Sequence, residues 1–139
     1  MKTDDLKALL GSIDLFQSMP KRSLARLVKS GREISHPDGH EVILEGAGAI
    51  GFHLIIGGTA RVTTGGSVRR VLGVGDYFGE FSVIDGKPRS ASVEAVDSLR
   101  TFAIAPAIVK GLIEDNPEFA RTLLLLLCSR LREAEARSA

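Results

Sequence analysis

The sequence contains few cysteines, little excess of either charge and no long apolar run. Its single cysteine, Cys128, cannot form an internal disulfide, which favours a reducing compartment. The 18 Lys and Arg residues nearly balance the 17 Asp and Glu residues, so no basic surface points to nucleic acid or an anionic membrane. The longest leucine run, 123–127, is far shorter than the roughly 20 apolar residues that cross a bilayer. The acidic start Met1–Asp5 does not match a signal peptide. These absences predict a soluble, cytoplasmic protein.

Length and hydrophobic spacing predict one domain, residues 1–139, made of three segments. Residues 1–32 have apolar residues at helical spacing, and we expect helices there, the second starting near Pro20. Residues 33–105 hold short apolar runs between glycine-rich turns, which indicates a sandwich, jelly roll or small barrel. Residues 106–139 return to helical spacing, with a short helix and then a long one that ends near Arg137. The expected fold class is α+β, mainly β.

Glycine pairs mark the expected turns of the β-segment. Gly57-Gly58 separates the apolar runs 52–56 and 59–63, which is the pattern of a two-residue hairpin. Gly65-Gly66 predicts a second hairpin that leads into a strand at 68–72. Further strands are expected at 41–44, 90–95 and 98–104.

The last helix is apolar over most of its surface. Phe119, Leu123 and Leu127 lie on one stripe, and the leucines between them extend the apolar surface around the helix. Such a helix must be buried on more than one side. One side can cover the β-segment and the other can pack on a second copy of the chain; alternatively, the whole helix folds back on its own chain. We expect Cys128 to be a small buried side chain there.

The stretch 76–91 carries the parts of a site for a small phosphate-bearing ligand. Gly79 lets the backbone approach a ligand closely. The guanidinium of Arg89 can neutralise a phosphate, and the carboxylate of Glu80 can accept a hydrogen bond from a sugar hydroxyl. Each residue alone is most simply a turn glycine, a solvated arginine or a surface glutamate. Their combination in one segment favours ligand binding.

The sequences FGEFSVI (78–84) and PRSASV (88–93) resemble the phosphate-binding cassette of cyclic nucleotide-binding domains. The resemblance covers about residues 13–132 and includes three further segments: 45–46, 52–58 and 72–76. It implies an eight-stranded β-roll, a jelly-roll-like double-stranded β-helix, with helices before it and a short helix plus a long lid helix after it. It also implies that the ligand is cAMP or cGMP.

The resemblance implies roles for the residues of the cassette, 78–91. Arg89 would pair with the cyclic phosphate, while Ser90 and Ala91 would add hydroxyl and backbone N–H contacts. Glu80 would accept from the ribose 2′-hydroxyl. The expected ligand contacts are Phe78, Gly79, Glu80, Phe81, Ser82, Arg89, Ser90 and Ala91.

Recognition of the base cannot be transferred from the family in the same way. Members of the catabolite-activator type use two hydroxyl residues of the long helix, and the equivalent positions here are Ala134 and Glu135. Some bacterial channel members place an arginine over the base, and Arg130 falls at that position. The candidate base contacts are Arg70, Leu72, Arg130, Arg132 and Glu135. The sequence does not decide between the two nucleotides, and cAMP is the expected one.

The histidines raise the alternative of a cupin-type metal site, formed by His36, His40 and His53 with Glu41 and Glu45. Such sites need a His-x-His pair on one strand, whereas His36 and His40 flank a Pro-Asp-Gly turn. We therefore expect solvated loop histidines, no metal and no cofactor. No Ser-His-Asp or Cys-His arrangement has supporting context, so we expect no catalytic residues.

The sequence thus predicts a non-enzymatic cyclic nucleotide receptor or regulatory domain, in which the ligand draws the last helix onto the base. Two alternatives stay open. The chain can be a fragment of a larger regulated protein, such as a transcription factor, channel or enzyme, or an interaction module that keeps the fold without a ligand. We expect a homodimer through the last helix, and no DNA binding because no helix-turn-helix follows that helix. A membrane partner is not expected either.

Overall fold

The computed structural model describes residues 2–43, 51–79 and 91–138, and these residues form helices at both ends and a sheet between them. The first helices are α1 (Thr3–Ser12), the short 3-10 helix η1 (Asp14–Phe16) and α2 (Lys21–Ser30). Gly31 ends α2, and only glycine fits there because a Cβ would collide with the Phe102 ring. The glycine thus lets α2 lead into the sheet at close range.

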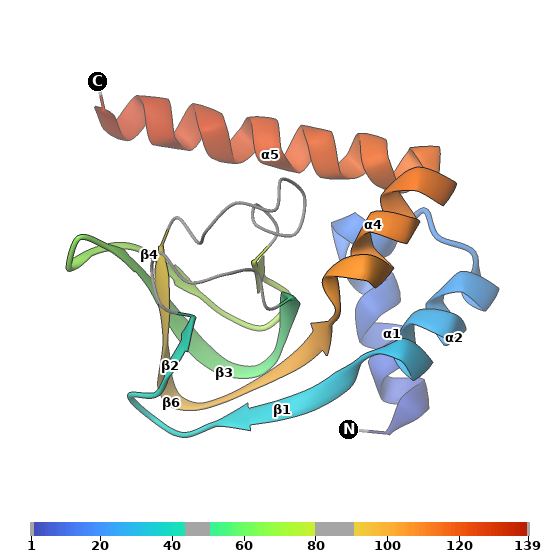
Figure 1. The fold of residues 1–139 in the computed structure, drawn as a ribbon, viewed down its shortest axis with the longest axis horizontal. Coiled ribbons are helices and arrows are strands. Elements are labelled where there is room, and N and C mark those ends of the chain that lie inside the picture. The colour runs from blue at the N-terminus through green and yellow to red at the C-terminus, as the bar shows by residue number, and fades with distance from the viewer. Residues whose placement is uncertain (1, 44–50, 80–90, 139) are drawn as a thin grey trace.

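The described strands form one antiparallel sheet. They are β1 (Arg32–His36), β2 (Glu41–Ile43), β3 (Phe52–Thr64), β4 (Ser67–Leu72), β5 (Tyr77–Phe78) and β6 (Ser92–Ile104). The strand order is β1-β6-β3-β4, with β2 also paired to β6 and β5 to β3. Figure 1 shows that the two long strands, β3 and β6, curve together, so that the sheet forms a roll whose open side faces the last helix.

The prediction of a hairpin at Gly57-Gly58 is wrong, because β3 is one continuous strand that includes both glycines. The register between β3 and β6 shifts on both sides of Gly57. Gly58 has a φ of +80°, and a Cβ there would collide with the Ser98 carbonyl of β6. Across the pair, Asp97 also has a left-handed φ of 58°. The glycines therefore allow the two long strands β3 and β6 to bend where they pair. The strands expected at 52–56 and 59–63 are both part of β3, and those expected at 90–95 and 98–104 are both part of β6.

The second glycine pair does form the expected hairpin. Thr64 of β3 pairs with Ser67 of β4, and the two residues between them, Gly65 and Gly66, have φ values of 58° and 80°. Two successive positive φ values are the signature of a type I′ turn, which glycine adopts without strain.

The protein has two apolar cores, which lie on opposite faces of the sheet. Alternate residues of β3 point to opposite faces, so that Leu54 faces the helices while Ile55 faces the inside of the roll. We call the first group the helical core; it includes Leu10, Phe16, Phe52, Leu54, Phe102 and Phe119. The second group, the roll core, consists of Ile55, Ala60, Leu72, Phe78, Val93, Ala95 and Leu99.

The chain ends in α4 (Pro106–Asp115) and α5 (Pro117–Ser138), close to the expected bounds. Phe119 and Leu123 bury one face of α5 in the helical core, and the Phe119 ring stacks on Phe16 at 5.7 Å. On another face, Leu124, Leu125 and Leu131 are 64%, 59% and 60% exposed. Cys128 is exposed as well, so the prediction of a buried cysteine is wrong.

Figure 1 shows α5 crossing the open side of the roll with its C-terminal half clear of the other helices. None of the described helices is long and apolar enough to cross a membrane.

Candidate functional site

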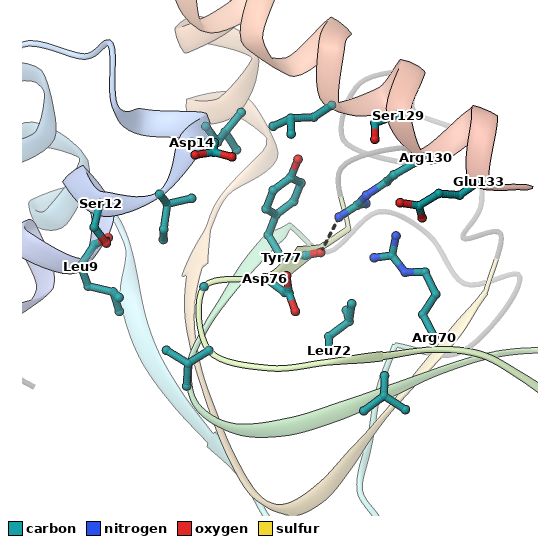
Figure 2. A pocket seen from close by; sticks show the side chains of 16 residues that line it. Leu9, Ser12, Asp14, Arg70, Leu72, Asp76, Tyr77, Ser129, Arg130 and Glu133 are labelled. Carbon is teal, nitrogen blue, oxygen red and sulfur yellow. Dashed lines mark hydrogen bonds between the residues drawn. The ribbon is translucent and has the colours of Figure 1, made fainter.

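A cleft of about 800 Å³ lies where α5 crosses the mouth of the roll (Figure 2). The end of α1, η1, β4, the turn before β5, and α5 form its walls. The polar and charged side chains among its lining residues are Ser12, Asp14, Arg70, Asp76, Tyr77, Ser129, Arg130 and Glu133. In Figure 2 the guanidinium groups of Arg70 and Arg130 reach into the same part of the cleft from β4 and α5. This cleft is the candidate site among the described residues.

Arg130 attaches α5 to the roll at Tyr77. Its Nη2 donates a hydrogen bond to the Tyr77 carbonyl oxygen at 3.2 Å. Its guanidinium carbon also lies 4.6 Å from the centroid of the Tyr77 ring, within the range of a cation–π interaction. The Tyr77 ring is buried and stacks on Phe52 at 5.1 Å, which holds it in place. The last helix is therefore in direct contact with the residue that precedes Phe78 and Gly79.

Charged groups of both signs surround Arg130 in the cleft. Burial and the neighbouring Arg70 lower the pKa of Arg130, although Tyr77, Asp76 and Glu133 partly offset this effect. An arginine nevertheless stays charged in a protein. Burial raises the pKa of Tyr77, and Arg130 and Arg70 oppose that shift. Both guanidinium groups carry only hydrogen-bond donors, so they suit a ligand that offers acceptor atoms.

A tight turn between β4 and β5 fixes the position of Tyr77. The Gly73 N–H donates to the Asp76 carboxylate at 2.9 Å, and the Asp76 N–H donates to the Gly73 carbonyl at 3.0 Å. Gly75 has a φ of +93°, which glycine adopts without strain. Ile55 of β3 bonds to this turn through both its N–H and its carbonyl, so that the turn is held against the sheet.

The described ends of the cassette are Phe78, Gly79 and Ala91. Phe78 is buried in the roll core. Gly79 has a φ of +94°, a conformation that other residues rarely adopt, and its expected contact with the ligand stays a prediction. Ala91 is half-buried and lies directly before β6. Five expected contacts lie outside the described residues, and their roles stay predictions: Glu80, Phe81, Ser82, Arg89 and Ser90.

The structure brings three of the five candidate base contacts together. Arg70, Leu72 and Arg130 all line the cleft. Arg132 and Glu135 are exposed on α5 and are not among the lining residues, so their roles also stay predictions. Sequence reasoning missed Tyr77, the partner of Arg130, and its position beside the cassette was the only available signal.

The prediction of solvated histidines is wrong for His36 and His53, which are 8% and 4% exposed. Both rings bond to the buried Thr101 hydroxyl, His36 through Nε2 at 3.3 Å and His53 through Nδ1 at 3.0 Å. They lie on the roll-core face of β1 and β3, because side chains alternate along a strand. His40 is exposed. Within the described ranges no three His, Cys, Asp or Glu side chains gather as metal ligands, and Glu45 lies outside those ranges.

Comparisons with known proteins agree with this fold. The CRP-like cAMP-activated global transcriptional regulator of Mycobacterium tuberculosis is 29% identical over 129 residues, which are 89% of this chain and 58% of that protein. The cGMP-dependent 3′,5′-cGMP phosphodiesterase A of Dictyostelium discoideum is 29% identical over 99 residues, which are 71% of this chain and 11% of the enzyme.

A solved structure has a similar fold. The Thermus thermophilus catabolite activator protein superimposes with a TM-score of 0.78 at 29% identity, over 89% of this chain and 61% of that one. This confirms the expected jelly-roll fold with C-terminal helices. The chain spans little more than half the length of the M. tuberculosis regulator.

The family model described as the cyclic nucleotide-binding domain matches residues 33–116, from the first strand of the roll to the end of α4. That match covers most of the chain and includes the cassette and the Arg70 side of the cleft. The chain therefore belongs to the cyclic nucleotide-binding domain family.

Proposed function

We propose that this chain is a receptor for a cyclic nucleotide, cAMP in preference to cGMP, and that α5 passes on the binding signal. The observation that carries the proposal is the contact of Arg130 with Tyr77, directly before Phe78 and Gly79. The name of the M. tuberculosis relative supports cAMP, whereas that of the Dictyostelium relative keeps cGMP as the alternative. The described geometry offers binding groups, and we propose no catalytic step.

In this proposal the cassette holds the sugar and phosphate of the nucleotide. Arg89 pairs with the cyclic phosphate, with Ser90 and Ala91 beside it, and Glu80 accepts from the ribose hydroxyl. Phe78, Gly79, Phe81 and Ser82 supply the surrounding backbone. The base then extends toward the cleft, where Arg70, Leu72 and Arg130 meet it, with Arg132 and Glu135 as further candidates.

The two arginines explain how binding would reach α5. In the structure Arg130 is held by the Tyr77 carbonyl and ring, and Arg70 repels it. A base in the cleft offers acceptor atoms and an aromatic face to the same guanidinium. Arg130 exchanges one set of partners for the other, and α5 moves with it. The ligand shifts the position of α5 only by the difference in affinity between the two states.

We also propose that α5 pairs with a second copy of the chain. Leu124, Leu125 and Leu131 leave an apolar surface beside the exposed Cys128. A monomer rarely exposes large apolar side chains in such a row, and such rows mark interaction sites. Because the chain spans part of its relatives, any further activity of a longer protein stays outside this proposal.

Calorimetric titration with cAMP and with cGMP tests the binding proposal. We expect a saturable one-to-one signal with the wild type and affinity at least about tenfold weaker with Arg89→Ala, because a charge-assisted bond contributes about 1.5–3 kcal/mol. Arg69→Ala is the matched control, since Arg69 is an exposed arginine of β4. The proposal fails if neither nucleotide gives heat, or if both variants lose affinity equally.

A further inference from the structure

Three polar side chains are buried inside the roll. Among the described residues, only His36, His53 and Thr101 are both polar and buried. They come from β1, β3 and β6, and Thr101 lies between Ile34 of β1 and Ile55 of β3 in the strand register. We call His36, Thr101 and His53 the histidine–threonine cluster. Both rings bond to the same hydroxyl, so the protonation states of the two histidines are linked.

The Thr101 hydroxyl has one hydrogen to donate and two lone pairs. With both rings neutral, it donates to the unprotonated nitrogen of one ring and accepts the N–H of the other, which satisfies the hydroxyl hydrogen and one nitrogen of each ring. A proton on the accepting nitrogen turns that ring into a second donor, and the hydroxyl hydrogen then loses its partner in the cluster. The ring centroids of His36 and His53 are 6.2 Å apart, so two imidazolium charges would also repel each other. The hydrogen bonds of the cluster therefore favour the neutral form of both rings.

The cluster is connected to the cassette through one ring contact. The His53 ring stacks on Phe78 with centroids 4.9 Å apart and an angle of 3° between the planes. The two residues also face each other in the pairing of β3 with β5. Phe78 is followed by Gly79, whose left-handed backbone begins the cassette. The orientation of the His53 ring thus sets the position of the Phe78 ring.

The surroundings of His36 favour its neutral ring. His40 stacks on His36 at 5.7 Å, and burial and His40 together lower the pKa of His36. Glu33 of β1 lies 4.0 Å from Arg100 of β6. The Asp38 carboxylate accepts the Asp97 N–H at 2.9 Å. The other charged groups on the strands packed around the cluster are Glu41 of β2, Arg61 of β3, Asp76 next to β5, and Arg32 and Glu94 of β1 and β6.

We propose that His53 is a positioning residue for Phe78, and that protonation of the histidine–threonine cluster displaces this ring and weakens ligand binding at the cassette. The second half of the proposal rests on the proposed function. In this arrangement the site binds its nucleotide at neutral pH and releases it as the pH falls.

Proton linkage sets the size of the effect. If the ligand binds only the form with neutral rings, the affinity falls by the factor 1 + 10^(pKa − pH) as the free protein takes up a proton. With the ordinary histidine pKa of 6.5 this factor reaches about tenfold near pH 5.5, and a lowered pKa, as for His36, makes it smaller. We expect a fall of up to about tenfold between about pH 7.5 and about pH 5.5.

The experiment measures cAMP affinity at both pH values for the wild type, His53→Phe and His40→Gln. Phenylalanine keeps the ring that stacks on Phe78 but cannot take up a proton, so His53→Phe should bind with an affinity that does not change with pH. His40→Gln removes a histidine outside the hydrogen-bonded cluster and should keep the wild-type pH dependence. Wild-type affinity that is equal at both pH values, or a pH dependence that persists in His53→Phe, would overturn the proposal.

A second measurement requires neither a variant nor a ligand. NMR resonances of the Phe78 ring in the free wild-type protein should shift with pH, with the same midpoint as the ring resonances of His36 or His53. Phe78 resonances that stay unchanged while a histidine of the cluster titrates would contradict the positioning role. Absence of cAMP binding at every pH would instead count against the proposed function, since the Phe78 resonances test the positioning by themselves.

Discussion

Replacing Arg130 with alanine gives the most detailed test of how α5 is attached. The change removes the charged hydrogen bond to the Tyr77 carbonyl, about 1.5–3 kcal/mol, and the cation–π contact, about 0.5–2 kcal/mol. It also removes the repulsion by Arg70 and the desolvation of a half-buried cation, both of which act in the opposite direction. We therefore expect Arg130→Ala to lower the free energy of unfolding by about 1–2 kcal/mol.

A double-mutant cycle with Tyr77→Leu separates the two contacts. Leucine removes the ring but keeps the backbone carbonyl, so the coupling energy between the two positions reports the cation–π contact alone. For a partly exposed arginine we expect a coupling of about 0.5–1 kcal/mol. Arg121→Ala is the control, since Arg121 is an exposed arginine of the same helix, and it should change stability by less than about 0.5 kcal/mol.

Urea unfolding followed by circular dichroism is the assay, because the chain has no tryptophan and its single tyrosine is one of the mutated residues. A coupling energy of zero within error would show that Arg130 does not contact the Tyr77 ring in solution. In that case the proposed exchange of partners by Arg130 would lose its basis.

Three further predictions follow from the same structure. Mild oxidation should link two chains through the exposed Cys128, and Leu131→Glu should abolish the link; a monomer in sedimentation that never cross-links would contradict the dimer. Gly58→Ala should lower the free energy of unfolding by more than about 1 kcal/mol, because φ is positive there and a Cβ meets the neighbouring strand. Gly111→Ala in α4 should instead raise the free energy of unfolding by about 0.5–1 kcal/mol. Equal shifts of the thermal unfolding temperature in the two variants would refute this. The pKa of His36 is lower in the folded protein than in the unfolded chain, so the unfolded chain binds more protons and the free energy of unfolding should fall as the pH drops below 6.5. In urea unfolding, His36→Leu should make the free energy of unfolding depend less on pH in this range.

Local patterns with one physical solution could be predicted from the sequence. Gly65-Gly66 requires positive φ at two positions, and the type I′ hairpin follows. Pro106 cannot donate a hydrogen bond, which suits the first turn of a helix, and α4 starts there. The apolar excess of α5 predicted two covered faces, and the structure shows one that is buried and one that is exposed.

The remaining features depend on contacts distant in sequence. Gly57-Gly58 predicts a hairpin from the sequence alone, because a glycine pair between two apolar runs is typical both of a turn and of a bend in a long strand. The backbone of the opposing residue Asp97 distinguishes the two, and its position depends on pairing with a distant strand. The burial of His53 could not be predicted, because its hydrogen-bond partner Thr101 is distant in sequence.

Tyr77 and Arg130 are 53 positions apart, and no periodicity connects them. The sequence therefore located the cassette through its motif but could not supply the contact that joins it to α5.

The most direct test of the central claim is a crystal structure of this chain grown with cAMP. The account predicts one nucleotide with its phosphate at Arg89 and its ribose at Glu80. It also predicts that the Arg130 guanidinium contacts the base in place of the Tyr77 carbonyl, from which it lies 3.2 Å in the structure described above. A nucleotide bound away from Arg89, or a bound base with Arg130 still on Tyr77, would contradict it.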